Sequence, residues 1–395
     1  MLLLEGYTAL DLTDLRGQFC GKALRDLGME VIKVEPPGGD PVRRIGPFAH
    51  DRPSLESSLR FAYLNGGKKS LTLDLGHAEG RALLLRLVEQ ADVLVESYAP
   101  GELEQLGLGE AALRARNPRL VLTSVTAFGQ TGPYRDYLGS DLVGLAMGGL
   151  MNISGDPALP PVNAPETQSY YFTCIYALLG TLLALWRREE AGEGHNVDVS
   201  EEEAIASQEH IIRTFGFDKE VMRRHGSQHE HVAPANIFPT KDGYVYLFVS
   251  LPHWRLLLKL WEDHPPELDD KEWEANHVRR AHADWLNEEL SRFTRRFTKQ
   301  EFVRLMQENG VPSLPVNSPG EFARDEQVQF RKLFQTVRHP LLDEYAQVAF
   351  PVLMDGERVP VAPPPLLGEH TYALLTERLG LSPTEVELLF AQGII

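Results

Sequence analysis

The chain has 395 residues, of which 43% are hydrophobic, and this is more than one hydrophobic core usually holds, so we expect two domains. Its formal net charge of -17 leaves no basic surface for nucleic acid or for an anionic membrane. Cys20 and Cys174 are too few for a disulfide framework, no cationic leader opens the sequence, and no apolar stretch reaches membrane-spanning length, so we predict a cytoplasmic protein.

The first part of the sequence alternates apolar runs with helical patterns. Four runs have the composition of buried strands, at residues 7–12, 30–35, 92–96 and 119–124. Helical periodicity separates them, most clearly over residues 78–91. Strands connected by helices form a parallel sheet, so this part is predicted to be an α/β domain.

A different pattern follows residue 205. One strand, at residues 244–248, is followed by helical patterns at residues 254–261, 282–293 and 299–307. We therefore expect a smaller α+β domain over residues 206–329. The large domain is then made of residues 1–205 and 330–395.

Residues 160–200 are the most informative stretch of the sequence. They begin as a polar loop, continue as a long apolar helix and end in a run that we predict to be a buried strand. A loop of this shape suits a catalytic group at the start of the helix. However, the residues there, Thr167, Gln168, Ser169 and Tyr170, include no carboxylate, thiol or imidazole.

Short motifs spread over nearly the whole chain resemble those of the class III CoA-transferase family, which includes formyl-CoA and carnitine CoA-transferases and the α-methylacyl-CoA racemases. The matching motifs are at residues 9–13 (ALDLT), 26–28 (DLG), 31–35 (VIKVE), 38–41 (GGDP), 92–96 (DVLVE), 128–133 (FGQTGP) and 366–371 (LLGEHT). The resemblance implies a Rossmann-like large domain built from both ends of the chain, a smaller central domain and an interlocked dimer. It also implies coenzyme A and acyl-CoA as substrates, with no tightly bound cofactor and no metal.

In the transferases of this family an Asp attacks the donor thioester, and the enzyme then carries CoA to the acceptor acid. Two anchors locate this position here, the pair Pro160 and Pro161 and, within the long helix, the motif GTLLAL at residues 180–185. The equivalent residue is Tyr170, or Ser169 if the register moves by one. The His that the racemases pair with their Asp falls at Ser140, so acid and base are both missing.

Glu166 is the nearest carboxylate to the missing Asp. It lies about one helical turn too early, and active-site geometry rarely tolerates such a shift. A role as a carboxylate at the N-terminus of the helix is the stronger interpretation.

The resemblance also predicts the CoA contacts. Leu15 and Arg16 are expected against the adenine, Lys68 near a phosphate, and Ser97 and Tyr98 beside the pantetheine. Two cations that the family often has are replaced, one by Pro36 and Pro37 and the other by Gln105. Arg43 and Arg44 follow closely and could compensate.

Three hypotheses remain open. In the first, the chain is the non-catalytic subunit of a heteromeric CoA-transferase, and its partner is a homologous catalytic subunit, as in the benzylsuccinate-type enzymes of aromatic degradation. In the second, it is a self-sufficient homodimer that uses a displaced carboxylate such as Glu166. In the third, it binds CoA thioesters without turnover.

Overall fold

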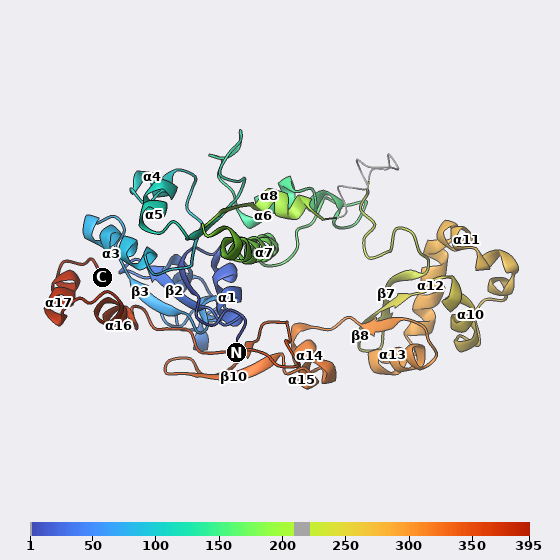
Figure 1. Cartoon of the computed structure of the whole chain (residues 1–395). Helices are drawn as coiled ribbons and strands as arrows, with labels where there is room; N and C mark the ends of the chain where they lie inside the picture. Colours follow the sequence, from blue (N-terminus) through green and yellow to red (C-terminus); the bar gives the residue numbers. More distant parts are fainter. Residues whose placement is uncertain (1, 209–221) are drawn as a thin grey trace. The chain divides into compact units, whose positions relative to one another are not determined.

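The computed structural model describes residues 2–208 and 222–395 (Figure 1). The chain divides into two compact units. Unit 1 consists of Met1–Met151, Asn163–Glu220 and Gln327–Ile395, and unit 2 of Asn152–Val162 and Val221–Glu326.

A parallel sheet of six strands, in the order β3-β2-β1-β4-β5-β6, forms the centre of unit 1. This is the strand order of a doubly wound dinucleotide-binding fold. The strands are β1 (Thr8–Leu12), β2 (Glu30–Glu35), β3 (Lys69–Thr72), β4 (Val93–Glu96), β5 (Val121–Thr126) and β6 (Asn196–Ser200). The predicted α/β class and parallel sheet are confirmed.

Helices cover both faces of this sheet. Among the described residues, the α-helices of unit 1 that precede its C-terminal segment are α1 (Gln18–Asp26), α2 (Leu59–Asn65), α3 (Ala78–Val88), α4 (Glu102–Gln105), α5 (Glu110–Arg116), α6 (Asp141–Met147), α7 (Gln168–Ala191) and α8 (Glu201–Ala206). Successive side chains of β1 point to opposite faces of the sheet, and this shows which helices cover each face. Ala9 packs with α1 and α7 on one face, whereas Leu10 packs with α3 on the other. Strands that are apolar on both sides are what such a sheet requires.

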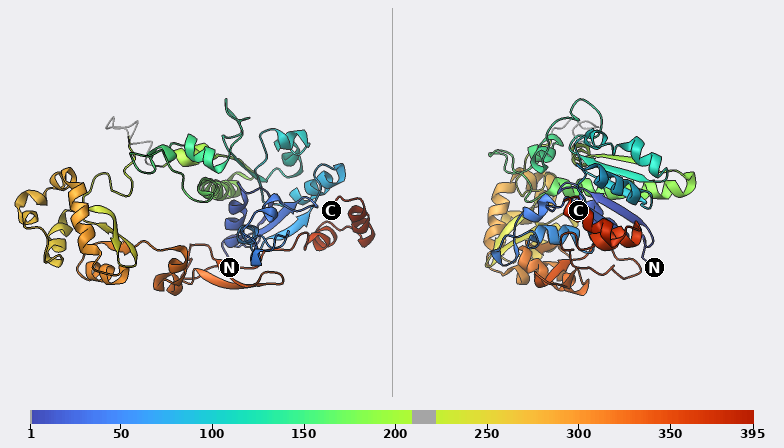
Figure 2. Two further views of the ribbon diagram at one scale, coloured as in Figure 1. Left: turned by 180° about the vertical axis from the view of Figure 1, so that it is seen from behind. Right: turned by 90° about the vertical axis from the view of Figure 1, so that its left-hand side faces the viewer.

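The C-terminal segment returns to unit 1 and completes it. It contains α15 (Glu326–Phe330), the hairpin of β10 (Phe334–His339) and β11 (Asp343–Val348), α16 (Thr371–Ala373) and α17 (Pro383–Ala391). In Figures 1 and 2, α16 and α17 lie beside β3 and α3. Apolar residues of α17 and of the turn that follows α16 join the core on that face. The chain before α16 runs along β3, where His370 N donates to Ser70 O at 3.0 Å.

Unit 2 has its own core around a small antiparallel sheet in the order β7-β8-β9. Its elements are β7 (Ala235–Thr240), β8 (Gly243–Phe248), α10 (Leu251–Leu260), α11 (Asn276–Ala281), α12 (Ala283–Thr294), α13 (Lys299–Glu308), β9 (Ser313–Pro315) and α14 (Pro319–Arg324). Trp254, Trp261 and Phe302 are buried in its core.

Two expectations about residues 160–200 are wrong. The strand β6 is an edge strand rather than a buried one, and Asn196 and Asp198 on it are exposed. The expectation that no apolar stretch reaches membrane-spanning length is the second. The helix α7 has 24 residues and a mean hydropathy of 1.4 over its most apolar part, so by length and composition alone it could cross a membrane. Its face with Cys174, Ala177 and Leu178 is buried in unit 1, as in a core helix of a globular domain.

Candidate active site

A cavity of about 600 Å³ opens at the carboxyl ends of the central strands of unit 1. Thr13 follows β1, Val34 lies near the end of β2, Ser97 follows β4 and Ala127 follows β5, and all four line it. The strand order reverses at β1, which has β2 on one side and β4 on the other. Open α/β sheets bind their ligands at this switch point, so the cavity is the candidate ligand site.

Three of the five predicted CoA contacts line this cavity, namely Arg16, Ser97 and Tyr98. Ser97 Oγ donates to Asp14 Oδ1 at 2.8 Å and accepts from Asp14 N, which fixes the loop after β1 to the end of β4. Leu15 instead packs against the apolar cluster of Val42, Phe61 and Leu64.

Lys68, the predicted phosphate contact, is buried inside unit 1. Its Nζ lies 2.7 Å from Asp11 Oδ2 and donates to Gln18 O at 3.0 Å. Burial lowers the pKa of Lys68, and the carboxylate of Asp11 opposes that shift. A phosphate could reach this ammonium only if the ion pair opened, so Lys68 in this arrangement is not available to a ligand.

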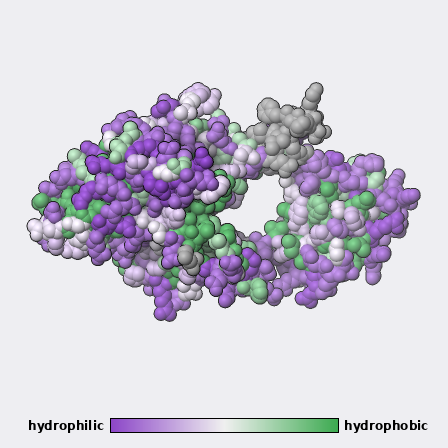
Figure 3. Space-filling view, viewed as in Figure 1, coloured by the Kyte–Doolittle hydropathy of each residue, from purple (hydrophilic) through white to green (hydrophobic). Residues whose placement is uncertain are grey.

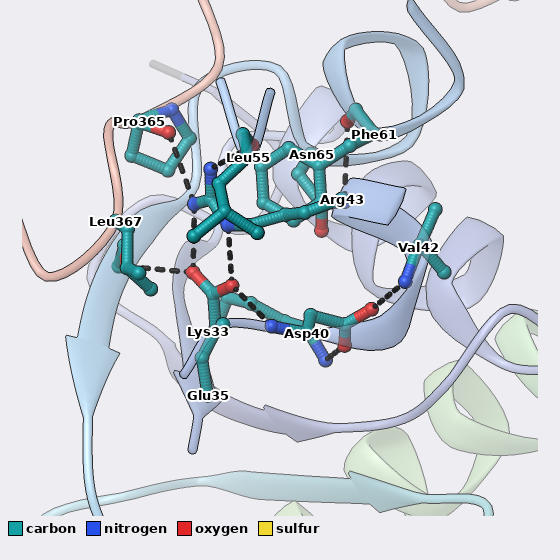
Figure 4. Close-up of polar contacts among 12 residues, drawn as sticks. Lys33, Glu35, Asp40, Val42, Arg43, Leu55, Phe61, Asn65, Pro365 and Leu367 are labelled. Carbon is teal, nitrogen blue, oxygen red and sulfur yellow. Dashed lines mark hydrogen bonds and ion pairs between the residues drawn. The ribbon is translucent and has the colours of Figure 1, made fainter. Parts of the chain in front are cut away.

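Arg43 is also held within a buried polar network (Figure 4). Its Nε lies 2.6 Å from Glu35 Oε2, its Nη2 donates to Glu35 Oε1 at 2.9 Å, and its guanidinium stacks on Phe61. Arg44 is exposed, and its side chain donates to Gly38 O and Gly39 O. Arg43 is therefore a structural residue and does not compensate for the replaced cations.

Lys33 and Arg135 are cavity-lining cations that the sequence did not single out. Lys33 is buried, and its Nζ lies 2.9 Å from Asp40 Oδ2. Arg135 is 41% exposed at the rim, and its Nε lies 3.2 Å from the exposed side chain of Asp136. Of these two cations, Arg135 is the one that an anionic ligand could reach without breaking a buried pair.

Tyr170, which we predict at the position of the family Asp, is half-buried in the first turn of α7. Arg16 lies over its ring, with 5.6 Å from the guanidinium carbon to the ring centroid. Burial raises the pKa of the Tyr170 phenol, although the charge of Arg16 opposes the shift. The phenol is therefore protonated at neutral pH, and a phenol in that form is a poor nucleophile.

Two carboxyl groups that the sequence did not point to meet beside Tyr170. Asp141 begins α6, Glu201 begins α8, and both contact the hydroxyl of Ser169. Arg16 Nε also lies 3.4 Å from Glu201 Oε2. The sequence offers no signal for this grouping, since Glu201 is the first of three consecutive glutamates in an ordinary acidic helix start.

Glu166 lies in the loop before α7 and points into solvent. Its side chain is 67% exposed, and its Oε2 lies 2.9 Å from Arg60 Nη2. Its φ of 60° is in the left-handed region, which a non-glycine residue adopts at some cost. Glu166 therefore does not occupy the place of the missing Asp in the first turn of α7.

Metal-ligating side chains do not cluster in the part of the chain that the structure describes. Within residues 2–208 and 222–395, no group of three or more His, Cys, Asp or Glu side chains is arranged to hold a metal ion.

The comparisons with known proteins agree on a family. A family model described as CoA-transferase family III matches residues 4–371. The succinyl-CoA–D-citramalate CoA-transferase of Chloroflexus aurantiacus is 35% identical, with 96% of this chain and 95% of that protein covered.

Two further relatives are subunits. Subunit BbsE of the succinyl-CoA:(R)-benzylsuccinate CoA-transferase of Thauera aromatica is 32% identical, with 98% of this chain and 97% of that protein covered. The beta subunit of the succinyl-CoA–L-malate CoA-transferase of Chloroflexus aurantiacus is also 32% identical, with 100% of this chain and 98% of that protein covered.

Solved structures share the fold. A CAIB/BAIF family protein from Brucella suis has a TM-score of 0.82 at 27% identity, over 94% of this chain and 98% of that chain. Rv3272 from Mycobacterium tuberculosis has a TM-score of 0.80 at 29% identity, over 94% of this chain and 99% of that chain.

Proposed function

The chain belongs to CoA-transferase family III, and we propose that it is the non-catalytic subunit of a heteromeric CoA-transferase. It binds a CoA thioester but does not supply the carboxylate that accepts the acyl group. A homologous subunit supplies that carboxylate.

The observation that carries this proposal is the identity and environment of Tyr170. Acyl transfer through a mixed anhydride needs a carboxylate at the start of α7, and this position holds a protonated phenol under Arg16. Ser169, the neighbour that a one-residue register shift would select, is buried and bonded to Asp141. Neither side chain can form the anhydride.

The cavity at the strand ends supports CoA binding. Its volume of about 600 Å³ is within the range of small-molecule sites, and Tyr98 and Ala99 give it an apolar wall. Arg16 and Arg135 supply positive charge at a site whose ligand is a polyanion, although the chain as a whole carries a net charge of -17.

A second subunit has a suitable surface on α7. Six large apolar residues recur along one exposed face of this helix: Phe172, Ile175, Tyr176, Leu179, Leu183 and Trp186. Figure 3 shows apolar surface at the position of α7. An apolar stripe of this length on a soluble protein suits a subunit interface, and we propose an interlocked dimer that buries it.

The relatives suggest the partner and the substrates. Two of them are subunits of CoA-transferases, and all three of those described above act with succinyl-CoA. We therefore propose succinyl-CoA or a similar thioester as the CoA donor and a dicarboxylic acid as the acceptor. If the protein acts in aromatic degradation, as BbsE suggests, the acceptor acid carries an aromatic ring. Cys20 and Cys174 are free thiols, which suits the cytoplasmic location that we propose.

A self-sufficient homodimer is the second candidate, and Asp141 favours it. This carboxylate is partly exposed and lies beside the first turn of α7, whereas Glu166 is paired with Arg60 in the preceding loop. Attack by Asp141 would require the hydrogen bonds from Ser169 to break. That requirement makes it the weaker candidate.

The test is native mass spectrometry of the protein purified from its own cells, followed by CoA-transfer assays of that material and of the isolated recombinant chain. We expect a heteromer with a second family member, and an isolated chain that binds CoA without turnover. A homodimer that transfers CoA unaided would overturn the proposal. In that case, trapping the acyl adduct on the wild-type chain and on Asp141→Asn would identify the carboxylate.

A further inference from the structure

Ser169 lies between two carboxyl groups at the start of α7. Its Oγ is 2.7 Å from Asp141 Oδ1 and also within hydrogen-bond distance of Glu201 Oε1. The carbonyl oxygen of Asp141 is a further acceptor, 3.2 Å from the same Oγ.

These contacts require a proton on one of the two carboxyl groups. The Ser169 hydroxyl has one hydrogen and can donate it to one acceptor, while an ionised carboxylate only accepts. The second close contact is therefore a hydrogen bond only if a protonated carboxyl donates to Ser169 Oγ. Without that proton, two negative charges would contact one buried oxygen.

The surroundings place the proton on Glu201. Asp141 Oδ1 also accepts the backbone N–H of Ser169 at 2.8 Å, and such a bond favours the ionised form. Glu201 is fully buried, and Gly144 of α6 leaves space for its carboxyl group. Burial raises the pKa of Glu201 to about 7, with the charge of Asp141 adding to the shift and Arg16 and Ser169 opposing it.

Arg16 lies next to Glu201 and also lines the cavity, so its charge can interact with both Glu201 and a bound ligand. The charged and titratable groups near Glu201 are Arg16 from the loop after β1 and Asp141 from α6, together with Tyr170 of α7, whose ring also contacts the Arg16 guanidinium. No described residue donates a hydrogen bond to Glu201 Oε2, although Arg16 Nε lies 3.4 Å away. Arg16 also lines the cavity and donates to Gly139 O at 2.9 Å.

We propose that Glu201 is a positioning residue whose proton couples the charge of Arg16 to ligand binding, so that binding of an anionic CoA compound in the cavity raises the protonated fraction of Glu201 near neutral pH. This inference rests on the proposed function, because it takes the cavity as the CoA site. An anion beside Arg16 competes for the guanidinium and weakens its attraction for an ionised Glu201. The neutral form of Glu201 is then favoured.

The experiment is isothermal titration calorimetry of coenzyme A with the dimeric or heteromeric protein as isolated, between pH 6 and pH 8. Each pH is measured in two buffers of different ionisation enthalpy, so that the heat difference gives the number of protons taken up. The variants are Glu201→Gln and, as the matched control, Glu203→Gln, which removes an exposed carboxylate from the same helix.

We expect wild type and Glu203→Gln to take up an additional fraction of a proton that Glu201→Gln lacks, largest near pH 7. The comparison with Glu201→Gln cancels the protons that the CoA phosphates themselves exchange. Equal proton uptake in all three proteins would overturn the inference and leave the proposed function standing. Absence of CoA binding in all three would overturn the proposed function and the coupling with it.

Folding of the variant is itself informative. The side-chain amide that Glu201→Gln introduces can donate to Ser169 as a protonated carboxyl does. We therefore expect this variant to fold and to be at least as stable as wild type at pH 8. If it failed to fold while Glu203→Gln folded, the assignment of the proton to Glu201 would be wrong.

Discussion

The guanidinium of Arg16 lies over the ring of Tyr170, with 5.6 Å from its central carbon to the ring centroid. This is the helix position at which the family resemblance predicts the Asp that accepts the acyl group, and the cation here faces an aromatic ring. A cation above a ring is stabilised by the ring quadrupole, and burial keeps the phenol neutral.

Replacing Tyr170 by Asp should introduce the missing nucleophile. Arg16 would favour the ionised form of the new carboxylate, so we expect Tyr170→Asp to form a covalent adduct with succinyl-CoA, at least about a hundredfold faster than wild type. Intact-mass spectrometry measures the adduct, and hydroxylamine should remove it. Tyr170→Asn is the matched control, and an adduct on wild type at the same rate would show that another residue is already the nucleophile.

Removing the carboxylate of Glu166 should have little effect. Exposed ion pairs contribute about 0–1 kcal/mol, and Glu166 is paired with Arg60 at the surface. We expect Glu166→Ala to unfold within about 1 kcal/mol of wild type and to leave the CoA-transfer rate of the assembled enzyme within about threefold. A rate loss of several orders of magnitude in a folded variant would make Glu166 the nucleophile.

Removing Arg43 should destabilise unit 1 strongly. It would leave Glu35 as a buried charge without its bidentate partner, which typically costs about 3–5 kcal/mol. Urea unfolding of Arg43→Met should therefore show a much lower midpoint than wild type. The exposed neighbour provides the control, since Arg44→Met should unfold close to wild type, and equal midpoints for the two variants would contradict the structural role.

The stability of the protein should depend on pH through Glu96. This buried carboxyl accepts the backbone N–H of Tyr98 at 2.7 Å, and burial raises its pKa to about 7 from 4.5. The folded state therefore holds a proton that the unfolded chain releases, so this group's contribution to stability falls as pH rises from about 4.5 to 7 and is level above that. The full change is about 3 kcal/mol.

Thermal unfolding between pH 4.5 and pH 8 measures this effect. Glu96→Gln should gain stability relative to wild type as the pH rises, while the exposed control Glu193→Gln should follow the wild-type profile. Parallel curves for Glu96→Gln and wild type would show that Glu96 is ionised in the folded protein throughout.

Arg135 should contribute to CoA affinity. Loss of one charge-assisted contact with a phosphate, partly screened at the exposed rim, should weaken CoA binding about tenfold in Arg135→Ala. Calorimetry at two salt concentrations should show a smaller salt dependence than in wild type. Arg187→Ala, which removes an exposed arginine of α7, should bind CoA as wild type does.

Much of the sheet could be predicted because its strands are apolar on both faces. The prediction for residues 30–35 coincides with β2, and β1, β4 and β5 are within two residues at each end. The strand β3 was missed because its four residues, KSLT, carry no strand pattern of their own. It is a strand because it pairs in parallel with β2, and the C-terminal segment lies along its other edge. Neither contact is visible in the local sequence.

The parts of the candidate site that could be predicted are those that nearby sequence motifs locate. Tyr170 could be located because two anchors on the same segment flank it. The family resemblance predicted Lys68 near a phosphate. In the structure its ammonium is paired with Asp11, 57 residues earlier, and the sequence alone does not show this ion pair. The contact between Ser169 and Glu201 likewise joins two helices whose packing only the fold defines.

The segment that covers β3 is also made very late. Ser70 in β3 bonds to His370, 300 residues further along the chain, and Thr72 N donates to Thr371 Oγ1 at 3.0 Å. At about 5–20 residues per second, translation of the intervening chain takes roughly 15 to 60 seconds, during which the edge of the nascent sheet stays open. An open strand edge can pair with another chain, so during this interval β3 is exposed to pairing with other chains until the C-terminal segment is made.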